Sequence, residues 1–294
     1  MQAFLNTAIK AARKAGDIAQ INFDRIGSND VRTKGYNEFV THVDEKAEQA
    51  IIEIIHSRYP DHSILGEEHG MHDNNSEFLW IIDPIDGTTN YIHGFPVYCV
   101  SIALKVKDRL EVGVIYDPSR QELFTAIRGM GSQLDGRKIR VSKHHALQGS
   151  LLGTGFPFRD QKDWLEVYLD IFTDFTKIVG AIRRPGSAAL DLAYVASGRY
   201  DGFWEFGLKP WDVAAGALLI QEAGGIVHNI IPGTDPVESG SLFCGNPKIF
   251  EALRTLLESP AKPAIIAPTI ITDEIALVTD IKGVCKDGVT LHTT

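Results

Sequence analysis

The chain has 294 residues, of which 44% are hydrophobic, and this length is enough to bury a large core in one domain or in two closely packed halves. The formal net charge of −9 argues against direct binding of DNA or RNA and against anionic membranes, because those partners reward an excess of lysine and arginine. If such an acidic protein binds a phosphate substrate, it needs a metal ion to neutralise the negative charge of that substrate.

Cysteine usage and hydrophobic patterning give the expected compartment. Cys99, Cys244 and Cys285 are widely separated and lack CxxC spacing, so they indicate neither a disulfide framework nor a zinc site. The first residues lack the apolar core of a signal peptide, and no stretch approaches the roughly 18 uninterrupted apolar residues of a membrane span. We expect a cytoplasmic protein without a membrane segment.

Apolar residues at helical spacing run from Leu5 to Ala19 and from Val43 to Ile55, and they predict two amphipathic helices separated by a polar turn at 27–37. Next comes a mainly antiparallel meander, with strands expected at 78–82, 97–106, 110–116, 122–127 and 139–141. The second half alternates, with helices expected at 161–178, from 187, from 210 and at 247–257, and strands near 182, 201–205, 225–228 and 242–244. Layers of helix and sheet follow from this order.

The last residues depart from this pattern. Pro260, Pro263 and Pro268 interrupt short isoleucine-rich pieces, and neither a helix nor a long strand is predicted there. We expect one domain over residues 1–258 and an atypical C-terminal tail over 259–294. A loosely held tail is favoured over one that packs on the body or adds an edge strand.

Residues 80–89 read Trp-Ile-Ile-Asp-Pro-Ile-Asp-Gly-Thr-Thr and follow an apolar run that predicts a buried strand. Pro84 is expected to stop the strand, so that Asp83 lies where the chain leaves the sheet. Gly87 allows close approach of an anion, and a helix beginning near Thr88 would point free N–H groups at it. Asp-Pro and Asp-Gly each occur in ordinary solvated turns. Together, Asp83 and Asp86 beside this turn indicate a site for a divalent cation and a phosphate.

This motif resembles the Asp-Pro-Ile-Asp-Gly-Thr signature of the inositol monophosphatase family, which comprises Mg²⁺-dependent, Li⁺-sensitive sugar-phosphate phosphatases. Similar segments occur in the family's order at 66–68 (Gly-Glu-Glu), 186–189 (Gly-Ser-Ala-Ala) and 211–216 (Trp-Asp-Val-Ala-Ala-Gly), and the resemblance runs through about residues 3 to 258. It implies an α+β sugar-phosphatase fold with alternating αβαβα layers. It also implies a homodimer.

The resemblance implies two Mg²⁺ ions at the site. Asp83 would bridge them, Glu67 and the carbonyl of Ile85 would complete one, and Asp86 and Asp212 would complete the other. From the residues alone, a solvated acidic turn is the favoured interpretation of Glu67, and the helix dipole by itself would favour Asp212 at a helix start. The sequence by itself therefore supplies only oxygen ligands beside a phosphate-ready turn.

For catalysis, the resemblance implies that Asp44 hydrogen-bonds Thr88 and that this pair orients and deprotonates the attacking water, with Glu67 acting on the same water through its metal. Asp44 lies three residues after Thr41, where a helix is expected to begin. A capping box is therefore the alternative role of Asp44, and both roles can coexist.

Two sets of substrate contacts are implied as well. Phosphate oxygens would bind the backbone N–H groups of Gly87, Thr88 and Thr89. The contacts expected on the polyol side are Gly186, Ser187, Ala188, Glu205, Asp86, Asp212 and Arg183. For Arg183, chosen ahead of Arg184, a solvated or subunit-interface role is the alternative.

The function that the resemblance implies is Mg²⁺-dependent hydrolysis of inositol monophosphate and related polyol phosphates. Fructose-1,6-bisphosphatase and 3′-phosphoadenosine-5′-phosphate phosphatase use the same metal core, so the core does not choose the substrate. Bacterial members of the family also join transcription antitermination complexes, which adds a docking role on RNA polymerase complexes as a second class of function. The acidic net charge leaves such protein docking open.

Overall fold

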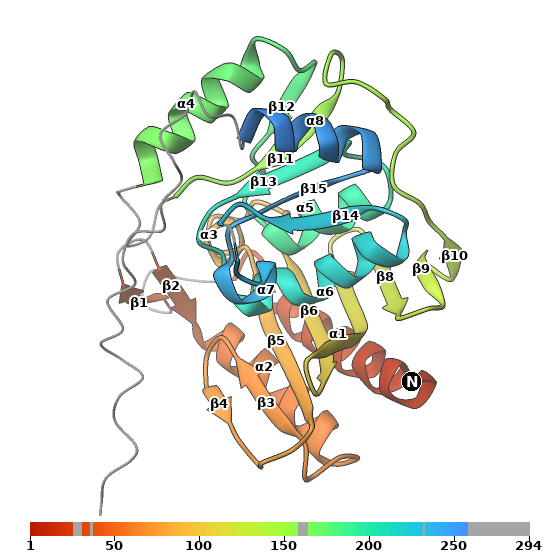
Figure 1. Cartoon of the computed structure of the whole chain (residues 1–294). Helices are drawn as coiled ribbons and strands as arrows, with labels where there is room; N and C mark the ends of the chain where they lie inside the picture. Colours follow the sequence, from red (N-terminus) through yellow and green to blue (C-terminus); the bar gives the residue numbers. More distant parts are fainter. Residues whose placement is uncertain (26–30, 36–37, 158–163, 232, 258–294) are drawn as a thin grey trace, which may run out of the picture.

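The computed structural model describes residues 1–25, 31–35, 38–157, 164–231 and 233–257 (Figure 1). Its first sheet contains eight strands in the order β10-β9-β8-β7-β6-β5-β3-β4. Neighbouring strands run antiparallel except for β3 and β5, which are parallel. The mainly antiparallel meander is therefore confirmed. The strands are β3 (Ser63–Gly66), β4 (Gly70–His72), β5 (Phe78–Asp86), β6 (Cys99–Val106), β7 (Arg109–Asp117), β8 (Glu122–Ile127), β9 (Gly131–Leu134) and β10 (Arg137–Lys138).

The two predicted amphipathic helices, α1 (Gln2–Asn22) and α2 (His42–His56), cover one face of this sheet. Trp80 and Ile82 of β5 pack against them, whereas Ile81, between the two, packs on the opposite face against α5 (Ala188–Ala196) and α6 (Pro210–Glu222). This alternation is expected of a strand buried on both sides.

A second sheet contains five strands in the order β12-β11-β13-β15-β14, with bounds β11 (Leu151–Thr154), β12 (Ala181–Arg183), β13 (Gly202–Glu205), β14 (Ile226–Asn229) and β15 (Leu242–Gly245). Phe203 faces α5 and α6, and its neighbour Trp204 faces the outer helices α4 (Leu165–Thr176) and α8 (Pro247–Leu257). The layers are therefore helix, sheet, helix, sheet, helix, in agreement with the expected αβαβα fold (Figure 1).

Several elements differ from the sequence predictions. Pro84 does not end β5, because the strand continues to Asp86 through a bulge: Asp83 pairs with Ser101 and Asp86 pairs with Cys99. The predicted strand at 139–141 is absent, and the chain instead forms the tight hairpin β9–β10 just before it.

The short strands β3, β4 and β11 were not predicted, nor were the hairpin β1 (Val31–Gly35) and β2 (Glu38–Thr41) and the short helix α7 (Pro236–Ser239). The helix considered near Thr88 is present as the short α3 (Thr88–Ile92). The predicted tail at 259–294 lies outside the described residues. In the described part of the chain, none of the helices has the length and apolar character that a bilayer span requires.

Candidate active site

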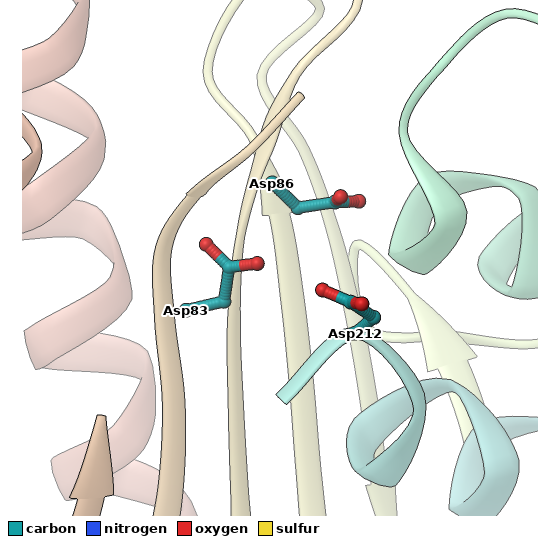
Figure 2. A group of neighbouring side chains, drawn as sticks. All are labelled: Asp83, Asp86 and Asp212. Carbon is teal, nitrogen blue, oxygen red and sulfur yellow. The ribbon is translucent and has the colours of Figure 1, made fainter. Parts of the chain in front are cut away.

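Three buried aspartates from two layers of the fold converge (Figure 2). Asp83 and Asp86 flank the bulge in β5, and Asp212 lies in the first turn of α6. One carboxylate oxygen from each of the three lies within 4.8 Å of the other two. The bulge is held by the N–H of Ile85, which donates to Asp83 Oδ1 at 2.9 Å. Asp212 Oδ2 accepts from the N–H of Lys209 at 2.8 Å, which fixes it at the start of the helix.

Burial and mutual repulsion disfavour the charged forms of these groups. The pKa of Asp83 is raised well above its usual value by burial and by the charges of Glu67, Asp86 and Asp212. The pKa of Asp86 is raised to about 7 by burial and by Asp212, although hydrogen bonds from Ser187 and α5 partly oppose this. Buried, converging carboxylates of this kind fit a hard divalent cation, which takes oxygen ligands and compensates their charge.

Glu67 joins the cluster through the pairing of two parallel strands. Gly66 at the end of β3 is in register with Ile82 of β5, so the next residue, Glu67, lies beside Asp83. The N–H of Glu67 donates to the carbonyl of Ile82 at 3.3 Å, and a side-chain hydrogen bond joins Glu67 to Asp83. Glu67 lies outside the tight group of three aspartates but contacts it.

Asp44 and Thr88 meet at the edge of the cluster. Thr88 Oγ1 lies 3.2 Å from Asp44 Oδ1 and 3.1 Å from the carbonyl of Ile85, to which it can donate. Asp44 Oδ2 accepts from both the N–H and the hydroxyl of Thr41, at 2.9 and 2.5 Å, and completes a capping box on α2. The two alternative roles that the sequence left open for Asp44 therefore use different oxygens of one carboxylate.

The turn after Asp86 depends on glycine. Gly87 has φ +99°, and a Cβ at this position would lie 2.9 Å from the carbonyl of Val97. The helix α3 begins at Thr88, so the N–H groups of its first turn have no partner within the helix. Asn90 then ties this turn to two others, because its amide nitrogen lies 2.8 Å from the carbonyls of both Val97 and Pro185.

On the polyol side, the start of α5 is bound to the cluster itself. Ser187 Oγ and the N–H of Ala189 donate to Asp86 Oδ2 at 2.6 and 2.8 Å, and the N–H of Ala188 also contributes. Gly186, with φ +92°, precedes them in the left-handed region. The residues predicted to contact substrate at 187 and 188 thus orient a candidate metal ligand.

The remaining predicted substrate residues occupy the end of the second sheet. Glu205 ends β13, and its carboxylate occupies the space where a Cβ on Gly155 would lie. Exposed Arg183 donates to its neighbouring carbonyl of Ile182 at 3.1 Å. Arg184, rather than Arg183, has its guanidinium next to Gly186 and over the ring of Phe156, 5.3 Å from the ring centroid.

Two residues that contact the site, Glu48 and Asn90, were not predicted from the sequence. Glu48 is fully buried and contacts the segment that carries Glu67, and Asn90 holds the turn that carries Thr88. The signal for Glu48 was its spacing, since it follows Asp44 by one helical turn on the same face of α2. No comparable signal marks Asn90. Its amide nitrogen is bonded to the carbonyls of Val97, Pro185 and Gly186, which lie in irregular segments, two of them far away in the sequence.

Comparisons with known proteins agree with this geometry. The model of the inositol monophosphatase family matches residues 1–260. The Nus factor SuhB of Pseudomonas aeruginosa is 50% identical over 269 residues, which cover 90% of this chain and 99% of that protein.

Two solved structures are similar over nearly their whole length. The extragenic suppressor protein suhB from Bartonella henselae has a TM-score of 0.84 and 39% identity, covering 88% of this chain and 99% of that one. The inositol monophosphatase from Anabaena has a TM-score of 0.75 and 39% identity, covering 90% and 98%. Fold, site and sequence thus agree, and the chain belongs to the inositol monophosphatase family.

Proposed function

We propose that the protein is a Mg²⁺-dependent phosphatase that hydrolyses phosphate monoesters of inositol and related polyols. The observation that carries the proposal is the buried cluster of Asp83, Asp86 and Asp212 next to the hydrogen-bonded pair Asp44 and Thr88. Membership of the inositol monophosphatase family supports phosphatase chemistry, and the similar structure from Anabaena is itself named an inositol monophosphatase.

The donor set fits magnesium because it consists of carboxylates and the carbonyl of Ile85. That carbonyl lies 3.1 Å from Thr88 Oγ1 and has two lone pairs, so it keeps at least one for a metal ion. Glu67, Asp83 and the carbonyl of Ile85 would hold one ion, and Asp83, Asp86 and Asp212 would hold the other. When bound, Mg²⁺ neutralises phosphate charge and lowers the pKa of water.

The protein groups then position the reactants. Thr88, anchored by Asp44, is placed to orient the attacking water and to accept its proton for relay to the carboxylate, with Glu67 close by. The N–H groups of the turn from Gly87 to Thr89 would hold phosphate oxygens. Polyol hydroxyls would meet the region of Gly186 and Glu205, and here the geometry favours Arg184 over Arg183 as the approaching cation.

A substrate panel tests the proposal. Purified protein is assayed with inositol-1-phosphate, fructose-1,6-bisphosphate and 3′-phosphoadenosine-5′-phosphate, in Mg²⁺ and in EDTA. We expect the highest kcat/KM for inositol-1-phosphate, inhibition by Li⁺, and no turnover in EDTA. Preference for either of the other two substrates would reject the proposed specificity but keep the proposed phosphatase chemistry. Full activity in EDTA would overturn the metal mechanism.

A second candidate function is docking on a transcription antitermination complex, as a cytoplasmic homodimer. It is favoured by one observation, the name Nus factor given to the relative that is 50% identical over most of this chain. Asp212→Asn removes a buried carboxylate without changing the outer surface. We therefore expect this variant to lose turnover and to retain the capture of RNA polymerase from a cell extract. Absence of polymerase from both the wild-type and variant captures would reject the docking role.

A further inference from the structure

Glu48, on α2, is a fully buried carboxylate that the proposed chemistry does not use. It receives three hydrogen bonds from the segment just after Glu67. Its Oε2 accepts from the N–H of Glu68 at 3.0 Å, and its Oε1 accepts from the N–H of His69 at 2.8 Å and lies 2.6 Å from His69 Nδ1. A buried carboxylate is tolerated when its oxygens are bonded in this way.

The same carboxylate also contacts the residue just before Glu67. A Cβ added to Gly66 would lie 2.6 Å from the carboxyl carbon of Glu48, so the backbone of β3 passes directly against it. Glu48 therefore contacts the chain on both sides of Glu67: it packs against Gly66 and accepts hydrogen bonds from Glu68 and His69. Glu67 itself makes two further contacts: its N–H donates to the carbonyl of Ile82, and its side chain is hydrogen-bonded to Asp83.

The position of Glu48 on its helix adds a second link. Asp44 precedes it by four residues, so both carboxylates project from one face of α2, one turn apart. Asp44 holds Thr88 and Glu48 holds the segment of Glu67. One rigid helix thereby sets the spacing between the two segments that bring the proposed general base and the proposed metal ligand to Asp83.

We propose that Glu48 is a positioning residue that fixes the backbone of Glu67 so that its carboxylate is preorganised to bind metal beside Asp83. The inference rests on the proposed metal site. Residues that orient a metal ligand through hydrogen bonds raise metal affinity, and their loss weakens it by about 10- to 100-fold. A residue that served only to stabilise the fold would leave the metal affinity of the folded protein unchanged.

The test compares Glu48→Gln with Glu53→Gln. Both changes replace a carboxylate on α2 by an amide, but the side chain of Glu53 is exposed, and its carboxylate accepts a hydrogen bond from Gln49, one turn away. Glutamine at 48 has one acceptor oxygen, and its NH₂ group would face an N–H donor. The hydrogen bonds to either Glu68 or His69 are therefore lost. Binding of Mn²⁺, as a paramagnetic probe of the Mg²⁺ sites, is titrated by electron paramagnetic resonance, with circular dichroism as the check of folding.

For folded Glu48→Gln we expect Mn²⁺ affinity to fall by about 10- to 100-fold, while Glu53→Gln matches the wild type. Gly66→Ala, which pushes on the same carboxylate from β3, should lower the affinity as well, and its effect should not add to that of Glu48→Gln. Wild-type affinity in folded Glu48→Gln would overturn the inference. If that variant does not fold, His69→Ala, which removes one donor, decides by the same criterion. Failure of the wild type to bind Mn²⁺ would instead reject the metal site itself.

Discussion

The hydroxyl of Thr88 lies between Asp44 and the carbonyl of Ile85, and its proposed role depends on that hydroxyl alone. Thr88→Ala should lower kcat by at least about 100-fold, the usual scale of general acid–base catalysis, with a smaller change in KM. Thr88→Ser keeps the hydroxyl and should retain most of the turnover. Steady-state kinetics on inositol-1-phosphate distinguish the two, and near-normal kcat for Thr88→Ala would leave Asp44 as a helix cap only.

Asp83 is held among like charges, and burial together with Glu67, Asp86 and Asp212 raises its pKa. Asp83→Asn should therefore raise the thermal stability of the protein in EDTA, because it removes repulsion and keeps an oxygen for the N–H of Ile85. The same change should abolish most activity and the stabilisation by saturating Mg²⁺, since binding to the folded state is lost. Melting curves with and without Mg²⁺ check both effects, and an equal Mg²⁺ response in the variant would contradict the bridging assignment.

At the scale of single elements, the amide of Asn90 joins α3 to the segment before β6 and to the segment before α5. Asn90→Ala should lower the free energy of unfolding by about 1–3 kcal/mol, because carbonyls are left without a donor. Asn90→Asp should lower the free energy of unfolding more than Asn90→Ala, because it places carboxylate oxygens against carbonyl oxygens. Chemical denaturation measures both, and an aspartate variant as stable as the wild type would show that the amide is not needed.

The strand β5 is also held by a histidine that must stay neutral. His62 Nδ1 accepts from Trp80 Nε1 at 3.0 Å, and its ring stacks on Phe78 with centroids 4.4 Å apart. Burial lowers the pKa of His62 below its usual 6.5, an effect that Asp61 opposes and His56 reinforces. The unfolded chain therefore binds more protons below about pH 6.5. The contribution to stability is complete above that pH and is lost as the pH falls.

We expect the wild type to lose stability relative to His62→Phe as the pH falls below about 6.5, because the variant keeps the stacking and removes the titration. Denaturation series at several pH values measure the difference. Identical pH dependence in both proteins would exclude His62 as a contributor.

How far the sequence predicted the elements depends on how local their signals are. The long helices and the strands β6 to β8 carry strong periodicity, and their existence and type are confirmed. The short strands β3 and β11 are defined by parallel partners elsewhere in the chain, Ile81 and Phe203 among them, so no local pattern marks them. The bulge at Pro84 likewise arises from pairing with β6 rather than from the proline alone.

For the site, too, local patterns could be predicted from the sequence and long-range contacts could not. The Asp-Pro-Ile-Asp-Gly-Thr-Thr motif is contiguous, so its residues could be named from sequence, and the structure brings Asp83, Asp86 and Asp212 together. The binding of Ser187 to Asp86, by contrast, joins residues 101 positions apart. Such a contact is fixed only when the central helices pack between both sheets.

At the scale of the whole molecule, the site lies where the first sheet meets the central helix layer. The first sheet supplies Asp83 and Asp86, and the central helix layer supplies Asp212 from α6 and Ser187 from α5. Gly113 of β7 and Ala215 of α6 pack closely, since a Cβ on Gly113 would lie 2.9 Å from the carbonyl of Ala215. The distance between the aspartates is thus set by backbone packing as well as by side chains.

The whole-molecule prediction concerns the end of the chain, where the family match stops at residue 260. A chain ending at 260 should keep the melting temperature and turnover of the full protein, as expected if residues 259–294 form a separate tail. A control chain ending at 246 also removes α8, whose buried side chains include Ile249, Phe250, Leu253 and Leu257. Their burial contributes roughly 6–12 kcal/mol, at about 1.5–3 each, which is comparable to the whole stability of a typical domain. The shorter chain should therefore fail to fold. Unfolding or inactivity of the 1–260 chain would show that the tail is part of the domain.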